Sequence, residues 1–172
     1  MVERAAVNRD VEGSSPSSGA NFSTVPGLIN MTHKRAHIAV MVASFQGRDL
    51  DARYLGYFDC FNRQLFYEAH DTLEDLLLSD RHGPDGNFYK GLIQLAGAFV
   101  HLQKQRLRPA AALFKLALAN LEKYPREHEH LNLAAVYQLI QKWLGSLEAA
   151  HFEKNPFTSG NAPKLALDPP HR

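Results

Sequence analysis

The sequence has little of what marks secreted, membrane-spanning or strongly charged proteins. It holds one cysteine, Cys60, in 172 residues, so the chain can form no internal disulfide and carries no cysteine-based zinc motif. Lys and Arg total 19 against 18 Asp and Glu, so no net charge favours nucleic acid or an anionic membrane. We therefore expect no nucleic-acid partner and a reducing, cytoplasmic location.

Long apolar runs are also missing. A helix needs about 20 consecutive apolar residues to cross a bilayer. The apolar stretch at 36–45, AHIAVMVASF, is far shorter, and no cleavable signal peptide precedes it. We therefore expect a soluble protein with no membrane contact.

The length of the chain predicts one domain flanked by tails. Residues 1–30 are rich in Ser, Gly and Pro and show no helical or alternating pattern, so a disordered tail is expected there. An N-terminal segment follows at 31–50. The helical domain is predicted at 51–150, and an irregular C-terminal tail at 151–172.

The N-terminal stretch holds a second feature. GlySerSerPro at 13–16 can be encoded by GGTTCGAGTCC, which resembles the T-arm of a transfer RNA gene. This resemblance predicts a translation start further downstream, at Met31 or Met41. A genuine disordered tail and a transit peptide are the alternatives, although Glu3 and Asp10 are unusual in a transit peptide.

From Asp51 onward, apolar residues recur at spacings of three and four, which is the period of amphipathic helices. Turn-forming residues, together with Pro109 and Pro125, separate the periodic segments. The pattern predicts helices at about 51–63 and 66–79, a third that Asp85 or Asn87 caps and that runs to about Lys104, a fourth from Pro109 to just before Pro125, and a fifth at about 130–150. We expect an all-α, single-domain bundle of about five helices, arranged as helical hairpins with tetratricopeptide-like packing.

The helix expected at 66–79 carries many polar residues. At about 100° per residue, Glu68, Asp71 and Asp75 project away from the apolar stripe. They are predicted to form a solvated face. His70 and Glu74 lie beside the stripe, one turn apart, so their side chains can touch.

The helix expected at 86–104 offers two similar residues, because Gln94 and His101 also border its apolar stripe. Small residues at 91 and 96–98 would let another helix approach closely. If the two helices pack together, four side chains converge in a polar cluster: His70, Glu74, Gln94 and His101.

These residues resemble a known family. GluAlaHisAspThrLeuGlu at 68–74, followed by GlyLeuIleGlnLeuAlaGlyAlaPheValHisLeu at 91–102, is similar to the domain of unknown function 309 family of small helical proteins. The resemblance covers about 54–124. It implies an all-helical fold and a set of residues to examine, but no activity. The matching positions are Phe61, Asn62, Glu68, Ala69, His70, Glu74, Gly91, Gln94 and His101.

The chain departs from the family pattern at three places. Gln64 stands where the family usually has Gly, and Asp71 replaces a Glu. Gln105 and Arg106 replace a usual Gly-Asn turn. These differences concern the geometry of the loops and leave the four polar residues in place.

The polar cluster, with Glu68 as a secondary candidate, allows three interpretations. We favour a buried hydrogen-bond network that sets the register of the helices. The alternatives are a metal site, for which Gln94 is a poor ligand, and acid-base chemistry by His70 oriented by Glu74. No metal ligand is assigned and no cofactor is expected.

Two other candidates are assigned a structural role. HisGluHis at 128–130 is predicted to be a solvated helix start, because residues two apart do not share a helix face. Cys60 has no cationic neighbour in sequence and is expected to be an inert, half-buried thiol.

Two classes of function follow from these patterns. We expect a protein-interaction or scaffold module that binds a protein partner. The alternative is a metal- or small-molecule-binding enzyme that uses the cluster. A shallow apolar groove would favour the first class, and an enclosed polar pocket would favour the second.

Overall fold

The fold is all-α, as predicted. The computed structural model describes the backbone at 26–80 and 82–169 and the side chains from His33 onward, so most of the tail expected at 1–30 lies outside the described residues. The elements are α1 (Pro26–Val42), η1 (Ala43–Phe45), α2 (Ala52–Asn62), α3 (Phe66–Ser79), α4 (Gly86–Gln103), α5 (Leu107–Leu121), β1 (Glu127–His128), β2 (Leu131–Asn132) and α6 (Leu133–Ala149).

Two expectations need correction. The described residues hold six α-helices, because the segment before Asp51 includes helix α1, which the irregular pattern of 31–50 did not reveal. The HisGluHis stretch is part of a β-hairpin, not a helix start, since Glu127 pairs with Asn132 and His128 with Leu131. Glu129 and His130 form its turn at positive φ, which excludes a helix there.

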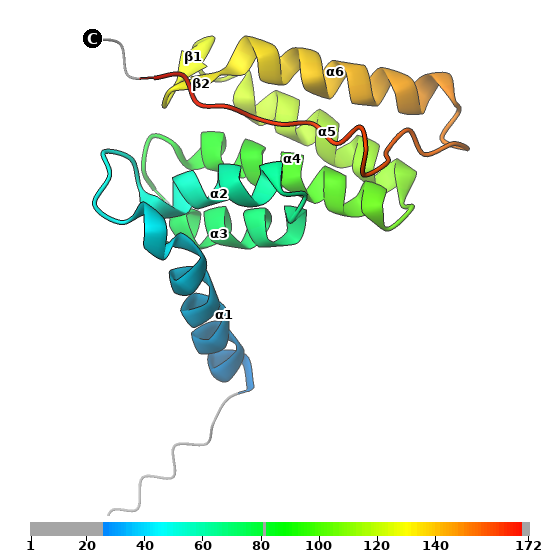
Figure 1. Cartoon of the computed structure of the whole chain (residues 1–172). Coiled ribbons are helices and arrows are strands. Elements are labelled where there is room, and N and C mark those ends of the chain that lie inside the picture. Colours follow the sequence, from blue (N-terminus) through cyan, green and yellow to red (C-terminus); the bar gives the residue numbers. More distant parts are fainter. Residues whose placement is uncertain (1–25, 81, 170–172) are drawn as a thin grey trace, which may run out of the picture.

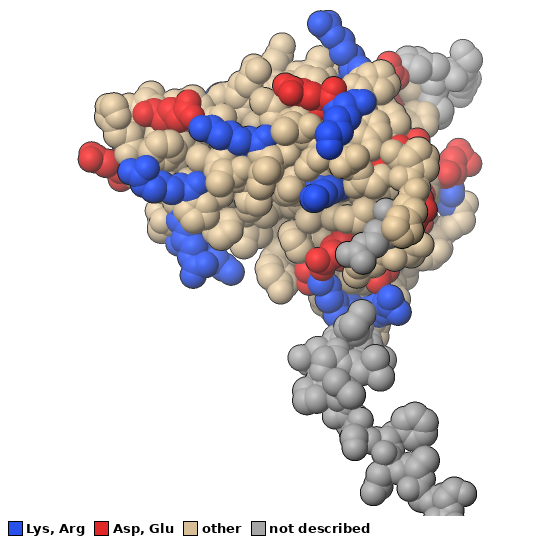
Figure 2. Space-filling view, turned by 180° about the vertical axis from the view of Figure 1, so that it is seen from behind, with Lys and Arg blue, Asp and Glu red and all other residues tan. Residues whose placement is uncertain are grey.

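The helices stack in chain order as antiparallel hairpins. α2 packs against α3, α3 against α4, α4 against α5, and α5 against α6. Helix α1 leaves this stack and projects from the α2–α3 side, as Figure 1 shows. Basic and acidic side chains are interspersed on the face seen in Figure 2. Among the described residues, no helix is long and apolar enough to cross a bilayer.

The core is centred on α4, whose apolar stripe is buried as predicted. Its five members, Phe88, Leu92, Leu95, Phe99 and Leu102, have no exposed surface. The predicted contact between α3 and α4 is confirmed. Gly91 lets α5 approach closely, because a Cβ atom there would lie 2.7 Å from Leu121 Cγ.

The inward face of α5 does not include every apolar residue at helical spacing. Ala112 and Leu116 face outward, and Leu116 is 50% exposed. Phe114 takes the central inward position, edge-on to Phe99 at a centroid distance of 5.3 Å. The larger aromatic side chain buries more apolar surface, so it sets the rotation of the helix.

The extended segment at 151–169, which we name the C-terminal strap, runs back along the bundle (Figure 1). Asn62 holds its distal half with two hydrogen bonds of 2.7 Å, one to the carbonyl oxygen and one from the N–H of Leu165. Phe157 packs against Phe66, Phe99 and Trp143. The strap therefore forms part of the core despite its irregular backbone.

Two interhelical turns place a glutamine in the left-handed region of backbone conformation. Gln64 ends the α2–α3 turn at φ 63°, and Gln105 ends the α4–α5 turn at φ 58°. A side chain in this conformation costs about 1 to 2 kcal/mol, which glycine avoids. Glycine would therefore suit both positions better than glutamine.

Replacing Gln64 with glycine is therefore expected to raise the free energy of unfolding by about 0.5 to 1 kcal/mol. The gain is partial, because the Gln64 side chain donates a hydrogen bond to the carbonyl of Ser159. Urea denaturation would measure it. Ala112→Gly, at an exposed position inside α5, is the control and should lower stability by about 1 kcal/mol. A loss of stability in Gln64→Gly would contradict the expectation.

Candidate functional site

Three of the four predicted cluster residues line one cleft. His70 from α3 and Gln94 and His101 from α4 border an opening of about 200 Å³ that reaches α5. We name it the α3–α5 cleft. Its remaining lining residues are mainly apolar: Tyr67, Ile93, Gly97, Val100 and Leu113.

Glu74, the fourth residue, does not line this cleft. It borders a second opening of about 500 Å³, between the end of α3, the following loop and the start of α4. The 100° projection placed His70 and Glu74 on one side of α3, and the two openings that they border share Ile93 of α4.

The cleft depends on a glycine. A Cβ atom at Gly97 would lie 3.1 Å from Leu113 Cδ1 and 3.9 Å from His70 Cδ2. Any side chain there would fill the space between α3 and α5. The small residues predicted to let helices approach therefore also create an opening at this position.

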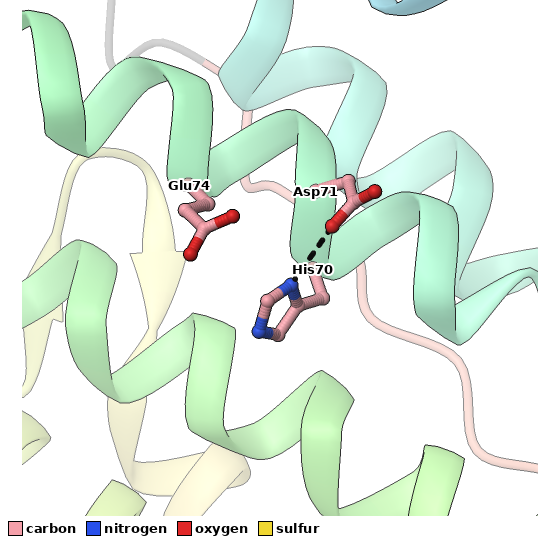
Figure 3. Close-up of side chains that lie close together, drawn as sticks. All are labelled: His70, Asp71 and Glu74. Atoms are coloured by element: carbon pink, nitrogen blue, oxygen red, sulfur yellow. Dashed lines mark hydrogen bonds and ion pairs between the residues drawn. The ribbon is translucent and has the colours of Figure 1, made fainter. Parts of the chain in front are cut away.

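His70 is oriented by its neighbour in sequence, Asp71. Its Nδ1 lies 3.2 Å from Asp71 Oδ1, as Figure 3 shows. Because a carboxylate only accepts hydrogen bonds, Nδ1 is the donor in this pair, and Nε2 takes no part in it. The ring itself points toward α4.

Gln94 and His101 behave differently from each other. Gln94 Oε1 accepts a hydrogen bond of 2.8 Å from Asn120 Nδ2 on α5. His101 Nδ1 is buried and has no hydrogen-bond partner among the described residues. Burial, and then the charges of Arg106 and Lys104, lower the pKa of His101, so the ring is neutral at pH 7.

Two of the three acidic residues predicted to form a solvated face, Asp71 and Asp75, are instead paired with cations, and α1 supplies one cation to each. Lys34 Nζ lies 2.9 Å from Asp71 Oδ1 and 2.7 Å from Glu74 Oε2. Asp75 pairs with Arg35 from α1 and Arg53 from α2. The projection treats α3 alone. It takes no account of α1, whose Lys34 is 40 positions before Glu74 in the sequence.

The predicted hydrogen-bond network is therefore not formed. Among the described residues, no hydrogen bond joins two members of the cluster. Three of its members pair with residues outside the cluster: His70 with Asp71, Glu74 with Lys34, and Gln94 with Asn120. Charged and amide side chains from outside the cluster satisfy the hydrogen-bonding groups of these three residues.

One alternative, a metal site, can be examined in the same place. Ligand atoms of His70, Asp71 and Glu74 lie within 4.8 Å of one another. The Lys34 ammonium already bridges the two carboxylates. A metal ion would have to displace this cation, so the triad is poorly suited to hold one.

The secondary candidates have structural surroundings. Glu68 is half-buried in the first turn of α3, where its backbone carbonyl accepts a hydrogen bond from Thr72, and it does not line the cleft. Cys60 is buried, and burial raises the pKa of its thiol to about 11. The thiol is therefore protonated at neutral pH and a poor nucleophile.

The pairing of Asp71 predicts a pH-dependent contribution to stability. Burial alone would raise the pKa of Asp71, but hydrogen bonds from His70 and Lys34 lower it below its ordinary value. A lowered pKa in the folded state adds stability above the unfolded value, about 3.9, and this stability is lost as the pH falls.

We therefore expect Asp71→Asn to lower the free energy of unfolding by about 1 kcal/mol at pH 7 and by much less near pH 3. Urea denaturation at both pH values measures the difference. The matched control is Asp59→Asn, whose partner Arg63 is one helical turn away and exposed. An equal effect at both pH values would show that the Asp71 ion pair is not the cause.

Together, the fold and the site define a small all-helical domain of stacked hairpins with a largely apolar cleft between its third, fourth and fifth helices. Residues 54–113 match the family described as Domain of unknown function (DUF309). The match confirms the resemblance seen in the sequence and includes all residues that line the cleft. No curated protein and no solved structure matches the chain.

Proposed function

We propose that this domain is a protein-interaction module that receives an apolar side chain of its partner in the α3–α5 cleft. The observation that supports this proposal is the character of the cleft, which is open, small and lined mainly by apolar residues. Such a groove was the feature expected of an interaction module, rather than of an enzyme.

The size of the cleft favours a side chain over a free metabolite. Small-molecule sites usually enclose about 300 to 1,000 Å³. The cleft offers about 200 Å³ and is open to solvent. A partner that inserts one apolar side chain could fill it and bury the surrounding surface at the same time.

Exposed apolar residues continue the surface beyond the cleft. Tyr67, at its edge, is 59% exposed, and Leu116, one turn from Leu113 on α5, is 50% exposed. Exposed apolar patches with a rigid aromatic residue are typical of binding surfaces. His70 Nε2 and Gln94 would supply polar contacts that fix the orientation of the partner.

Site-specific photo-crosslinking tests this proposal. A benzophenone amino acid replaces Tyr67 in one variant and Leu78, which borders the other opening and is 47% exposed, in a second. We expect a discrete crosslinked protein from the first position only. Equal crosslinking from both positions would argue against a specific surface.

The purified partner then allows an affinity measurement. Tyr67→Ala and Gly97→Leu, which fills the cleft, should each weaken binding by about tenfold or more, since truncation at a binding hot spot costs about 2 kcal/mol. Leu78→Ala should leave the affinity unchanged. Unchanged affinity in both cleft variants would place the partner elsewhere.

A second candidate function is binding of a small molecule with acid-base chemistry at His70. It is favoured by the pairing of His70 with Asp71 at 3.2 Å, which leaves Nε2 free to take up a proton. NMR of a fragment library would test it. Fragments that shift the His70 ring resonances, and lose affinity in His70→Gln but not in Tyr67→Ala, would support this function over the first.

A further inference from the structure

A second group of ligating side chains lies at the opposite end of α4 from His101, near the β-hairpin. Asp85 stands immediately before α4, and His128 and Glu129 belong to β1 and its turn. One ligand atom from each of the three lies within 4.8 Å of the others. None of these residues lines the α3–α5 cleft.

The fold holds these three residues in place from several sides. The His128 ring lies against Phe88 and Tyr124, at centroid distances of 4.8 and 4.7 Å. The backbone carbonyl of Glu129 accepts a hydrogen bond of 2.9 Å from the Tyr54 hydroxyl. The ring and the turn are therefore anchored to α2 and α4 by contacts that do not use the ligating atoms.

The ligating atoms face each other. His128 Nε2 lies 2.6 Å from Asp85 Oδ1, and the two side chains are 21% and 22% exposed. Asp85 makes no capping hydrogen bond to α4. Both side chains can therefore be reached from solvent, and neither is required to complete the helix.

The charge around this group contrasts with that of the His70, Asp71 and Glu74 triad. There, the Lys34 ammonium bridges both carboxylates. In the described part of the chain, no lysine or arginine pairs with Asp85 or Glu129. Two carboxylates and an imidazole thus lie close together, and no lysine or arginine side chain in the described part of the chain lies between the carboxylates. A metal ion could supply the positive charge at this position.

We propose that Asp85, His128 and Glu129 form a binding site for a divalent transition-metal ion of the zinc type. One imidazole nitrogen and two carboxylate oxygens are ligands that Zn²⁺ accepts, with water filling the remaining position. Ions that prefer oxygen alone, such as Mg²⁺ and Ca²⁺, gain little from the imidazole.

Binding requires only a small rearrangement. Tetrahedral zinc with ligands at about 2.1 Å separates neighbouring ligand atoms by about 3.4 Å, so the His128 and Asp85 atoms would move apart slightly. The metal takes the place of the proton that Nε2 shares with Asp85, and the neutral ring carries its proton on Nδ1 instead. The bound ion would tie the hairpin to the start of α4.

The test uses the untagged full-length chain, stripped of metal with a chelator. Titration with ZnCl₂, followed by calorimetry, should show one site. Because an ion bound only to the folded state stabilises it, saturating zinc should raise the melting temperature by about 5 to 10 °C. Mg²⁺ at the same concentration should leave the melting temperature unchanged.

Three variants locate the ion. Asp85→Asn, His128→Gln and Glu129→Gln should each weaken zinc binding by about tenfold or more. His130→Gln, which changes the neighbouring histidine of the same turn, is the matched control and should bind like the wild type. Circular dichroism with chelator present shows whether each variant is folded, and any two folded variants are sufficient.

Two results would overturn the proposal. Binding that is unchanged in the folded variants would exclude these residues as ligands. Binding that survives in His128→Gln but is lost in the Asp71→Asn, Glu74→Gln double variant would place the ion at the other triad. Neither result affects the proposed function, since the partner is measured through Tyr67 and Gly97 at the cleft.

Discussion

Replacing Phe99 with alanine is expected to lower the free energy of unfolding by about 3 to 5 kcal/mol, the usual cost of truncating a fully buried phenylalanine. The Phe99 ring has no exposed surface. It contacts one aromatic ring from each of four other helices, at centroid distances of 5.0 to 5.5 Å. These rings are Phe61 in α2, Phe66 in α3, Phe114 in α5 and Trp143 in α6.

The loss should affect the whole bundle, because the cavity opens where the hairpins meet. Urea denaturation followed by far-ultraviolet circular dichroism measures it. Leu116→Ala, which truncates a half-exposed residue of α5, is the control and should change stability by less than about 0.5 kcal/mol. A loss below about 1 kcal/mol in Phe99→Ala would mean that this ring does not join the helices as described.

Replacing Asn62 with alanine is expected to cost about 2 to 3 kcal/mol and to loosen the C-terminal strap. The side chain donates to the carbonyl of Leu165 and accepts from its N–H. Removing it leaves two backbone groups unpaired beside the buried Leu165 side chain, and each unpaired group costs about 1 to 3 kcal/mol. The expected loss is smaller than the sum of two full penalties, because Asn62 is half-buried.

Limited proteolysis gives a local readout of the same change. Lys164 lies directly before Leu165, so trypsin should cleave there faster in Asn62→Ala than in the wild type. Gln103→Ala removes one exposed hydrogen bond to the Gln64 carbonyl and serves as the control, with no change in cleavage. Cleavage at an unchanged rate in Asn62→Ala would show that the strap is held by its apolar contacts alone.

Asn62 thus has a structural role that sequence reasoning missed. The helical period places Asn62 at the end of α2, but its hydrogen-bond partner, Leu165, is 103 positions away in the sequence. The local sequence indicated that the residue was part of a motif, and nothing in it indicated the partner.

The sequence by itself determined the helices from α2 to α6 and the core of α4, because these depend on the 3.6-residue period and on turn-forming residues close in sequence. It also identified His70, Gln94 and His101, whose positions beside an apolar stripe follow from the same period. Their convergence at one cleft follows directly once α3 and α4 are neighbours.

Tertiary structure decided the partners. Lys34 reaches Asp71 and Glu74 from α1, the strap returns to Asn62, and the hairpin brings His128 to Asp85. Each of these contacts joins segments that are far apart along the chain. Local periodicity determines which face of a helix is apolar. The charged or amide group that lies opposite a polar side chain depends instead on how distant segments pack. For this reason the predicted network is replaced by pairs with residues outside the cluster.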